Sequence, residues 1–275
     1  MNSLVPRRFS ILFRACLAGA LACAGASGLA ARAASSLAPG GTLALGVDYV
    51  VPPFAAGSKV RTPEGIETFL ADDLARRLSA PAQTLQADPA SRGRLLDEGR
   101  AQLLLLPVAD ADPLRSSALV IPTGYSSGAM AIMRSDTNIK TWQQLAGRTV
   151  CLAQGGRYEG RIAAQYGALE KVFKAPADSL LALRTGGCDA AVHDSAMLEE
   201  LLKLPEWKKF SARLPTRDLV PLAFVVASGD SASAGLLRQV AKDWASSRFL
   251  EKTTKKAVQD IAFEVYLDQT VTDCH

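Results

Sequence analysis

Residues 43–78 read LALGVDYVVPPFAAGSKVRTPEGIETFLADDLARRL, and this stretch decides the fold. It begins as a short apolar strand, breaks at Pro52-Pro53, passes through a polar turn and ends as a helix. Within 68–78 the apolar residues recur at the spacing of a helix face that packs on a sheet. A strand that turns sharply into a helix is the opening unit of an α/β sheet.

A second unit of the same kind follows later in the chain. Residues 149–155 read as a strand that runs into a glycine-rich turn, and a helix begins near Ile162. Two such units indicate two lobes with a ligand cleft between them, because open sheets bind ligands where a strand ends and its helix begins. Further apolar runs predict strands at 101–108, 128–133, 188–193 and 221–227. Helices are expected at 142–145, 161–166, 179–184, 196–204, 234–249 and 253–266.

The chain is expected to cross between the lobes twice, near 134–138 and near 219–225. These crossings make the first lobe discontinuous, with residues 34–134 and 225–275. The second lobe then comprises residues 135–224, and each lobe has the size of an ordinary small domain.

Residues 1–33 read as a cleavable signal peptide. Arginines at positions 7, 8 and 14 form a basic start, and an apolar run rich in Ala and Gly follows over 15–31. The motif Ala31-Arg32-Ala33 fits the small residues of a cleavage site, so cleavage is expected near Ala33. The apolar run is too short and too weakly apolar for a membrane anchor. A twin-arginine signal and a lipoprotein site at Cys23 are less favoured alternatives.

The charge of the chain changes when the signal is removed. The whole chain has 31 basic and 27 acidic residues, a formal net charge of +4. Residues 1–33 contain four arginines and no acidic residue, so 27 basic and 27 acidic residues remain. The mature chain has no basic excess that would indicate a nucleic acid as its partner.

Cysteine and histidine are sparse in the mature chain. Cys151, Cys188 and Cys274 remain after the signal is removed, in a compartment that oxidises thiols. The sequence holds two histidines, and no group of Cys and His has the spacing of zinc ligands. No metal site and no cofactor is therefore expected.

Five motifs stand in an order typical of one protein family. Asp48 and Pro52-Pro53-Phe54 follow the first strand, and Gly65-Ile66-Glu67 precedes a helix that reads LADDLARRL. GRTVCLAQGG and ALRTGGCDAAVHDSAML come later in the chain. In this order the motifs resemble the periplasmic solute-binding proteins of ABC importers, namely the polar amino-acid-binding type known as bacterial extracellular solute-binding protein family 3. The resemblance covers nearly the whole mature chain.

The resemblance implies an α/β, two-lobed periplasmic-binding-protein-like fold of type II, in which each lobe is a mostly parallel sheet flanked by helices. It implies a monomeric periplasmic protein that is not an enzyme. Such a protein closes over a small polar ligand, an amino acid or a related compound, and delivers it to a membrane ABC permease. Two alternatives stay open: a dehydratase-like enzyme on the same fold that acts on a carboxylated substrate, and a binding module that serves a redox system or a receptor.

The family holds the two charged groups of an amino acid with an Arg and an Asp. Arg115 stands at the place of the Arg, whose planar guanidinium binds a carboxylate through two hydrogen bonds. Asp194 stands at the place of the Asp that holds the α-ammonium, and it could also cap the helix that follows. The ligand-binding residues implied by the resemblance are Asp48, Tyr49, Val51, Phe54, Asp110, Asp112, Arg115, Gly155, Gly156, Arg157, Tyr158 and Asp194.

Several residues of the first lobe depart from the family pattern. Val51 replaces a stacking aromatic residue, although Tyr49 is close. Asp110 and Asp112 replace hydroxyl residues that can hydrogen-bond a carboxylate, whereas an aspartate repels one. Together with Asp48 they could face a cationic group of the ligand. The alternative for Asp110 and Asp112 is a solvated loop and a helix cap.

The second lobe departs at the turn that follows its first strand. Arg157 replaces a hydroxyl residue there, and with Tyr158 it could face a second carboxylate or another anion. The alternative is that both side chains are exposed on the surface. His193 replaces a residue that the family usually keeps small, and its preferred interpretation is a packed histidine at a strand end.

The resemblance also implies a disulfide between Cys151 and Cys188. In the family the two strands that carry these positions are neighbours, and some members place cysteine at both. The alternative is a pair of buried free thiols. Cys274 is left over near the terminus, either free or linked to another chain.

Overall fold

The computed structural model describes residues 37, 40–52 and 56–269. All described residues belong to one compact unit of the chain, Ala34–His275. The predicted signal peptide lies outside the described residues, as do Phe54 and Cys274.

Nine strands within the described residues form one sheet, in the order β2-β1-β3-β9-β4-β7-β5-β6, with β8 paired to β4. The strands are β1 (Leu43–Val47), β2 (Ala82–Gln86), β3 (Leu103–Pro107), β4 (Ala118–Met133), β5 (Thr149–Ala153), β6 (Leu169–Phe173), β7 (Ala190–Asp194), β8 (Ala212–Arg213) and β9 (Arg217–Ala227).

The helices are α1 (Glu67–Leu78), α2 (Arg92–Asp97), α3 (Leu114–Ser117), α4 (Arg161–Tyr166), α5 (Pro176–Arg184), α6 (Ser195–Leu201), α7 (Ser231–Ser247), α8 (Phe249–Asp268) and the 3₁₀ helices η1 (Trp142–Leu145) and η2 (Pro205–Phe210). In this part of the chain, no helix has the length and apolar character needed to cross a membrane.

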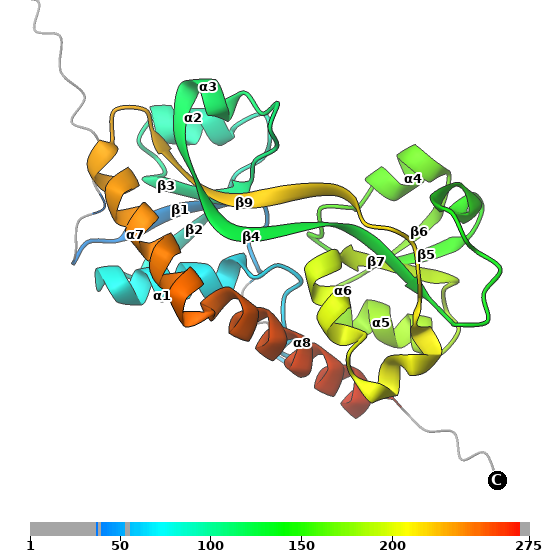
Figure 1. Cartoon of the computed structure of the whole chain (residues 1–275). Helices are drawn as coiled ribbons and strands as arrows, with labels where there is room; N and C mark the ends of the chain where they lie inside the picture. Colours follow the sequence, from blue (N-terminus) through cyan, green and yellow to red (C-terminus); the bar gives the residue numbers. More distant parts are fainter. Residues whose placement is uncertain (1–36, 38–39, 53–55, 270–275) are drawn as a thin grey trace, which may run out of the picture. The chain divides into compact units, whose positions relative to one another are not determined.

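Two groups of parallel strands are joined by two long antiparallel strands (Figure 1). In the first group β1 is parallel to β2 and β3, and in the second group β5 is parallel to β6 and β7. Between the groups β9 and β4 run antiparallel to each other, β9 pairing with β3 and β4 with β7. Parallel neighbours need crossover connections, which helices provide here. The predicted α/β architecture with two sheet groups is confirmed.

Strand β4 begins beside one group and ends beside the other. It pairs with β9 along most of its length, with register shifts between Pro122 and Ser126 and between Ser127 and Ala129. Such irregularities bend a strand and increase its twist. The sequence predicted only residues 128–133 as strand, because Pro122 and the polar residues after it interrupt the apolar pattern. The lobe boundaries at 134/135 and 224/225 remain predictions.

Each strand group has its own buried core. In the first, Leu70 and Leu74 of α1 pack with Leu45 of β1 and Trp244 of α7, and all four side chains are fully buried. The spacing of Leu70 and Leu74 is the helical face that the sequence predicted.

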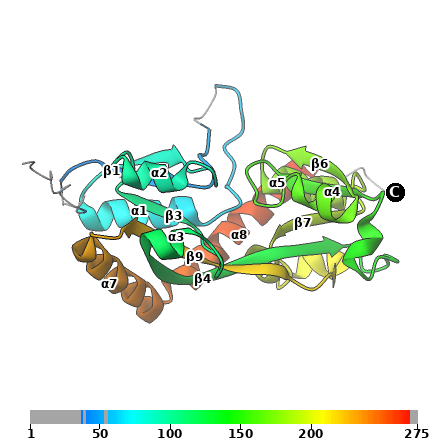
Figure 2. The same cartoon turned by 90° about the horizontal axis from the view of Figure 1, so that it is seen from above.

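Helix α8 belongs to the second core, although α7, which precedes it, belongs to the first. Val258, Ile261 and Val265 of α8 are buried against α5 and α6. Figures 1 and 2 show α8 extending from α7 toward these two helices. The last helix of the chain therefore contacts elements of both strand groups.

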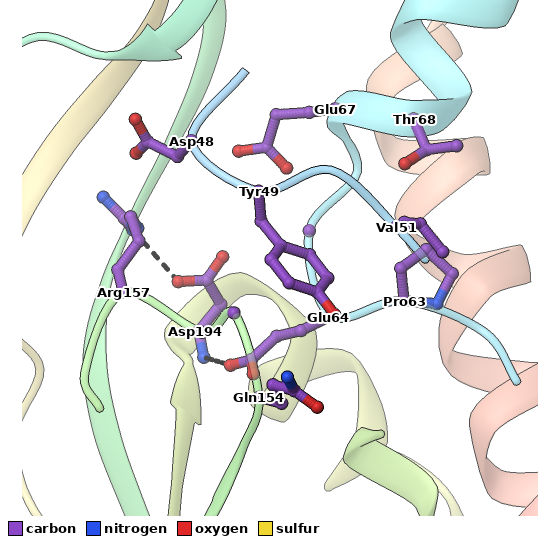
Figure 3. A pocket seen from close by; sticks show the side chains of 13 residues that line it. Asp48, Tyr49, Val51, Pro63, Glu64, Glu67, Thr68, Gln154, Arg157 and Asp194 are labelled. Carbon is purple, nitrogen blue, oxygen red and sulfur yellow. Dashed lines mark hydrogen bonds and ion pairs between the residues drawn. The ribbon is translucent and has the colours of Figure 1, made fainter. Parts of the chain in front are cut away.

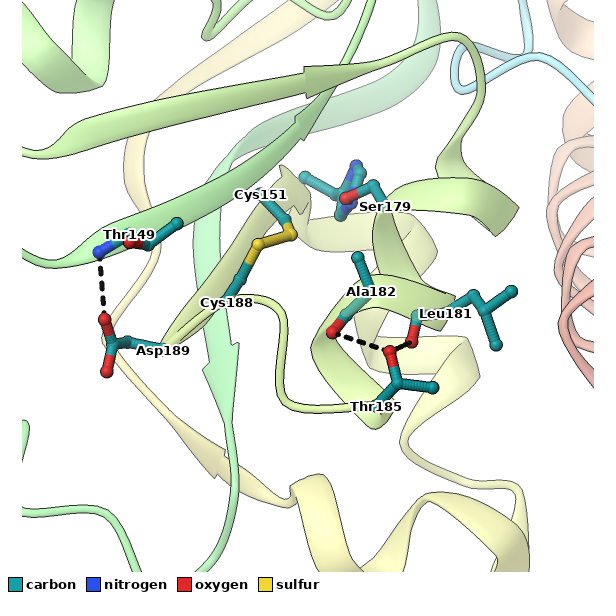
Figure 4. Close-up of a disulfide and its surroundings, with 9 residues drawn as sticks. Thr149, Cys151, Ser179, Leu181, Ala182, Thr185, Cys188 and Asp189 are labelled. Atoms are coloured by element: carbon teal, nitrogen blue, oxygen red, sulfur yellow. Dashed lines mark hydrogen bonds between the residues drawn. A yellow bond between two sulfur atoms is a disulfide. The ribbon is translucent and has the colours of Figure 1, made fainter. Parts of the chain in front are cut away.

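The predicted disulfide is confirmed. Cys151 of β5 is bonded to Cys188, which lies just before β7, and their Cα atoms are 5.9 Å apart (Figure 4). Strands β5 and β7 are parallel neighbours, so the bond links two adjacent strands whose ends reach the candidate site. Both cysteines are buried in the second core.

Candidate functional site

A cavity of about 50 Å³ lies where β1, β5 and β7 end. Side chains from the segment after β1, the turn after β5 and the end of β7 point into it (Figure 3). The structure brings together seven of the residues implied by the resemblance, namely Asp48, Tyr49, Val51, Gly155, Gly156, Arg157 and Asp194. Its position agrees with the general rule that open α/β sheets bind ligands beyond the carboxyl ends of their strands.

Six further residues that the sequence analysis did not single out as ligand-binding also line the cavity. They are Pro63, Glu64, Gly65, Glu67, Thr68 and Gln154. The sequence analysis named Glu67 only as the last residue of the Gly-Ile-Glu motif. The acidic residues in the turn before α1 were the sequence feature that could have indicated Glu64 and Glu67. The role of Glu64 could not be predicted from its local sequence, because its hydrogen-bond partner, Asp194, lies 130 positions later in the chain.

Asp194 is the last residue of β7, and its carboxylate pairs with Arg157. The residue is 6% exposed, and its Oδ1 accepts a hydrogen bond of 3.0 Å from Nη2 of Arg157 and another from the hydroxyl of Tyr158. Although Asp194 precedes α6, its side chain makes no capping hydrogen bond to that helix. Its carboxylate is therefore directed to the site rather than to the helix N-terminus.

Arg157 is held by three acceptors. Besides Asp194, its Nη2 donates to the backbone carbonyl of Ser127 at 3.0 Å and to the hydroxyl of Tyr158 at 3.1 Å. Burial alone would lower the pKa of Arg157, but Asp194 and Tyr158 outweigh it and raise that pKa above its usual value. The predicted alternative of a surface position does not describe Arg157 and Tyr158, because Tyr158 is buried and the Arg157 side chain is 19% exposed.

Glu64 connects the segment before α1 to the end of β7. Its Oε1 accepts a hydrogen bond of 3.1 Å from the backbone N–H of Asp194 and lies 3.1 Å from Nδ1 of His193. The second pair is not a hydrogen bond, so this Nδ1 has no hydrogen-bond partner among the described residues, and the other oxygen of Glu64, Oε2, has none there either. His193 is fully buried, with Nε2 at 2.9 Å from the hydroxyl of Ser179, as expected for a packed histidine at a strand end.

Two further carboxyl groups at the cavity have raised pKa values. Burial raises the pKa of Asp48 to about 6, against the opposing effect of Arg157. Burial and then the carboxylate of Asp194 raise the pKa of Glu67 to about 7. The lining thus contains four carboxyl groups and one guanidinium, which is itself paired with Asp194.

Tyr49 packs directly on the turn after β5. A Cβ atom at Gly155 would lie 2.2 Å from Cδ2 of the Tyr49 ring, and Gly155 has a φ of 73°, in the left-handed region. Both the close approach and the backbone conformation require glycine here. With the Tyr49 ring in place, the cavity has room for about three to five water molecules.

Four of the described residues implied by the resemblance do not line the cavity, namely Tyr158, Asp110, Asp112 and Arg115, although the hydroxyl of Tyr158 donates to Asp194 at the edge of the cavity. Arg115, in α3, donates to the backbone carbonyls of Ala109 and Val108 at 2.9 and 3.0 Å and lies 3.4 Å from the exposed carboxylate of Asp110. Asp112 accepts from the backbone N–H of Leu114 at 3.0 Å and from Arg92 at 2.6 Å. Their roles toward a ligand remain predictions.

No group of three or more His, Cys, Asp or Glu side chains arranged to hold a metal ion occurs among the described residues.

Solved structures resemble the described chain, although no protein-family model and no curated protein matches its sequence. A variant of ArgBP from T. maritima matches with a TM-score of 0.53 and 18% identity, over 79% of this chain and 95% of its own. An ancestral cationic amino acid solute-binding protein, AncCDT-1, matches with a TM-score of 0.55 and 17% identity over the same shares of the two chains, 79% and 95%.

A second structure of AncCDT-1 is named as an amino-acid-binding protein and a precursor of cyclohexadienyl dehydratase. It matches with a TM-score of 0.52 and 19% identity over 79% of this chain and 95% of its own. At these identities the likeness concerns the fold. The chain has the two-domain periplasmic-binding-protein fold that the sequence predicted.

Proposed function

We propose that this chain is an exported solute-binding protein that captures a small polar ligand, an amino acid or a related compound, in the cavity at the strand ends. The observation that carries the proposal is the convergence of charged side chains from both strand groups. Asp48 and Glu67 come from the first group, and Arg157 and Asp194 come from the second. The names of the similar structures, ArgBP and a cationic amino acid solute-binding protein, support the same class of ligand.

Ligand capture would follow from a hinge motion of the two predicted lobes. A ligand that contacts both lobes stabilises the closed arrangement, because only that arrangement offers all its contacts. The hydrogen bond from Asp194 N–H to Glu64 joins the same two walls of the cavity. The partner expected from the family resemblance is a membrane ABC permease that recognises the closed form, and the location expected is the periplasm.

A ligand screen by thermal shift tests the proposal. The mature chain is heated with amino acids, amines and small carboxylates, and each hit is measured by titration calorimetry. A ligand at a hundred times its dissociation constant adds roughly 2.7 kcal/mol to the free energy of unfolding. The substitution Asp48→Asn keeps the shape of a cavity side chain and removes its charge, so it should lower the affinity for the ligand found in the screen.

Asp136→Asn is the matched control, because Asp136 is exposed and, among the described residues, forms its ion pair with Arg134. Equal weakening by both substitutions, or a screen in which no small molecule raises the melting temperature, would contradict capture in this cavity.

A dehydratase-like enzyme is the second candidate. It is favoured by the position of Glu67 in the cavity lining, where burial and Asp194 raise the pKa of its carboxyl to about 7, since a general acid works best when its pKa is near the ambient pH. The name of the second AncCDT-1 structure points the same way. Mass spectrometry of each hit after incubation decides between the two: a binding protein returns its ligand unchanged, and an enzyme converts it in a manner that Glu67→Gln abolishes.

The third reading, a binding module for a redox system or a receptor, differs from transport in its partner. The genes that neighbour this one distinguish them: permease and ATPase genes support transport, and a dehydrogenase or receptor gene supports the module.

A further inference from the structure

The small cavity adjoins a larger groove. The groove has a volume of about 450 Å³, within the range of small-molecule sites. Five residues line both spaces, namely Tyr49, Val51, Pro63, Glu64 and Gln154. A ligand whose end lies in the small cavity would therefore pass Tyr49 and continue into the groove.

The small cavity is suited to a cation. Arg157 is the one basic side chain among the lining residues, and it is paired with Asp194, so the lining holds three further carboxyl groups, those of Asp48, Glu64 and Glu67, in excess over basic groups. Oε2 of Glu64 is buried and has no hydrogen-bond partner in the described part of the chain, and the Glu64 side chain is 7% exposed. A buried acceptor of this kind calls for a hydrogen-bond donor, and an ammonium group supplies three.

The groups of the small cavity that could bind a carboxylate are partly engaged, because Nη2 of Arg157 is already bonded to Ser127, Tyr158 and Asp194. The backbone N–H of Asp194 is occupied by Glu64, and Arg115 is bonded to backbone carbonyls away from the cavity. The volume of about 50 Å³, room for about three to five water molecules, holds an ammonium group and a short piece of the chain that carries it. An α-amino acid would bring its carboxylate, one carbon away, among the acidic side chains of the lining.

In contrast to the acidic small cavity, the groove is lined by apolar and basic residues. Val51, Val60 and Pro176 contribute apolar surface along it, and its basic residues are Lys59, Arg61 and Lys174. Lys59 pairs with Asp268, and Arg61 pairs with Asp178 and Asp268. Lys174 is exposed and forms no ion pair with any described residue, so its ammonium is available to an anion.

We propose that the ligand is an ω-amino acid, whose terminal ammonium enters the small cavity beside Asp48, Glu64 and Glu67 while its methylene chain and carboxylate lie in the groove toward Lys174. The inference rests on the proposed solute-binding function and narrows its ligand class. It separates the two charges of the ligand by several methylene groups, where an α-amino acid separates them by one carbon.

Two isomers test this class without changing the atoms of the ligand. 5-Aminopentanoate and 2-aminopentanoate have the same composition and the same two charged groups, and differ only in the position of the ammonium. Titration calorimetry on the mature chain should give at least about tenfold tighter binding of the 5-isomer, because one buried charge pair contributes that much or more. Pentylamine and pentanoate serve as probes that carry one charge each, and pentylamine should bind better than pentanoate.

Two variants assign the two ends of the ligand. Glu67→Gln should weaken 5-aminopentanoate and pentylamine by similar factors, because both place an ammonium in the small cavity. Lys174→Met should weaken 5-aminopentanoate and leave pentylamine unchanged, because only the former has a carboxylate in the groove. Lys171→Met is the control, since Lys171 is an exposed lysine of β6 that does not line the groove. Thermal melting of each variant verifies its folding.

The outcomes separate this inference from the function on which it rests. Tighter binding of 2-aminopentanoate would overturn the ω-amino acid class and leave a solute-binding protein for α-amino acids. Equal losses of affinity for 5-aminopentanoate and pentylamine in Lys174→Met would also overturn it, because Lys174 would then not bind the carboxylate in the groove. If no molecule of the thermal-shift screen binds, the proposed function itself fails and the inference falls with it.

Discussion

Arg61, in the segment before α1, donates a hydrogen bond of 2.6 Å to Asp178 of α5, 117 positions later in the chain. The same guanidinium contacts Asp268 at the end of α8 and lies 3.9 Å from Glu264, and its side chain is 16% exposed. One residue thus links the segment that lines the cavity to a helix of the second strand group and to α8.

Replacing Arg61 with Ala should destabilise the protein. The change leaves three half-buried carboxylates without their common partner, and hydrogen bonds between charged groups in such positions contribute roughly 1–3 kcal/mol. Urea unfolding measures the loss in the free energy of unfolding. Arg134→Ala is the control, because the Arg134–Asp136 pair is exposed on both sides, and it should unfold like the wild type. Identical midpoints for the two variants would show that the Arg61 contacts contribute no stability.

Arg115 is the residue on which the family resemblance and the geometry differ most. The resemblance predicts that Arg115→Ala loses about 2–5 kcal/mol of binding energy, the cost of truncating one partner of a desolvated charge pair. In the structure this guanidinium is bonded to the carbonyls of Val108 and Ala109 and does not line the cavity. We expect an affinity close to that of the wild type for the best ligand in titration calorimetry. A loss of the larger size would restore the carboxylate-binding role of Arg115.

The raised pKa values of Asp48 and Glu67 predict that the ligand-free protein loses stability as the pH rises. Folding raises the pKa of Asp48 from 3.8 to about 6 and that of Glu67 from 4.5 to about 7, so the folded state binds protons more tightly than the unfolded chain does. The resulting stabilisation is complete below about pH 4 and is lost as the pH passes 6 and then 7. Asp194 and Arg157 face Glu67 with opposite effects on its pKa, and Asp48 adds to the effect of Asp194.

Melting temperatures between pH 5 and pH 8 measure this dependence. The contribution of Glu67 is the part of the decline that disappears in Glu67→Gln, which cannot ionise. If Glu67→Gln and wild type decline in parallel, ionisation of Glu67 is not coupled to folding. A cationic ligand should bind more tightly at pH 8 than at pH 5, because it favours the ionised carboxyl groups.

Removing the disulfide should cost stability without altering the site. The bond closes a loop with a sequence separation of 37, for which the chain-entropy model gives roughly 3–4 kcal/mol. The double substitution Cys151→Ala with Cys188→Ala, followed by urea unfolding, measures this loss. Ligand affinity should stay the same, since neither cysteine lines the cavity. Peptide mapping of the unreduced wild type provides an independent measurement, and free thiols at both positions would contradict the bond.

The sequence predicted the elements whose residues carry a strong local pattern. The buried faces of α1 and β5 have regular apolar spacing, and the predicted helix over 68–78 differs from α1 by one residue at its start. Strands β2 and β6 were not predicted, because their sequences, AQTLQ and LEKVF, are largely exposed and mix polar with apolar residues. The first part of β4 was not predicted, because proline and glycine interrupt its apolar pattern.

The candidate site was predictable where a motif marks the end of a strand. Asp48, the Gly155-Gly156 turn and Asp194 were implied by the family motifs, and they line the cavity. Glu64 was not, because its role comes from a contact with a residue far along the chain. The orientation of Arg115 could not be predicted either, since local packing determines whether a flexible side chain binds a ligand or nearby carbonyls.

The irregular pairing of β4 with β9 has a consequence for the energy of opening. No pairs are formed between β4 and β9 from Thr123 to Tyr125, although Thr123 Oγ1 donates to the carbonyl of Leu222. If the proposed hinge motion bends the strands here, it would break few backbone hydrogen bonds. The balance between the open and closed forms would then depend mainly on the bond between Glu64 and Asp194 and on the ion pairs of Arg61. A substitution of Glu64 or Arg61 should therefore shift this balance more than one in either strand.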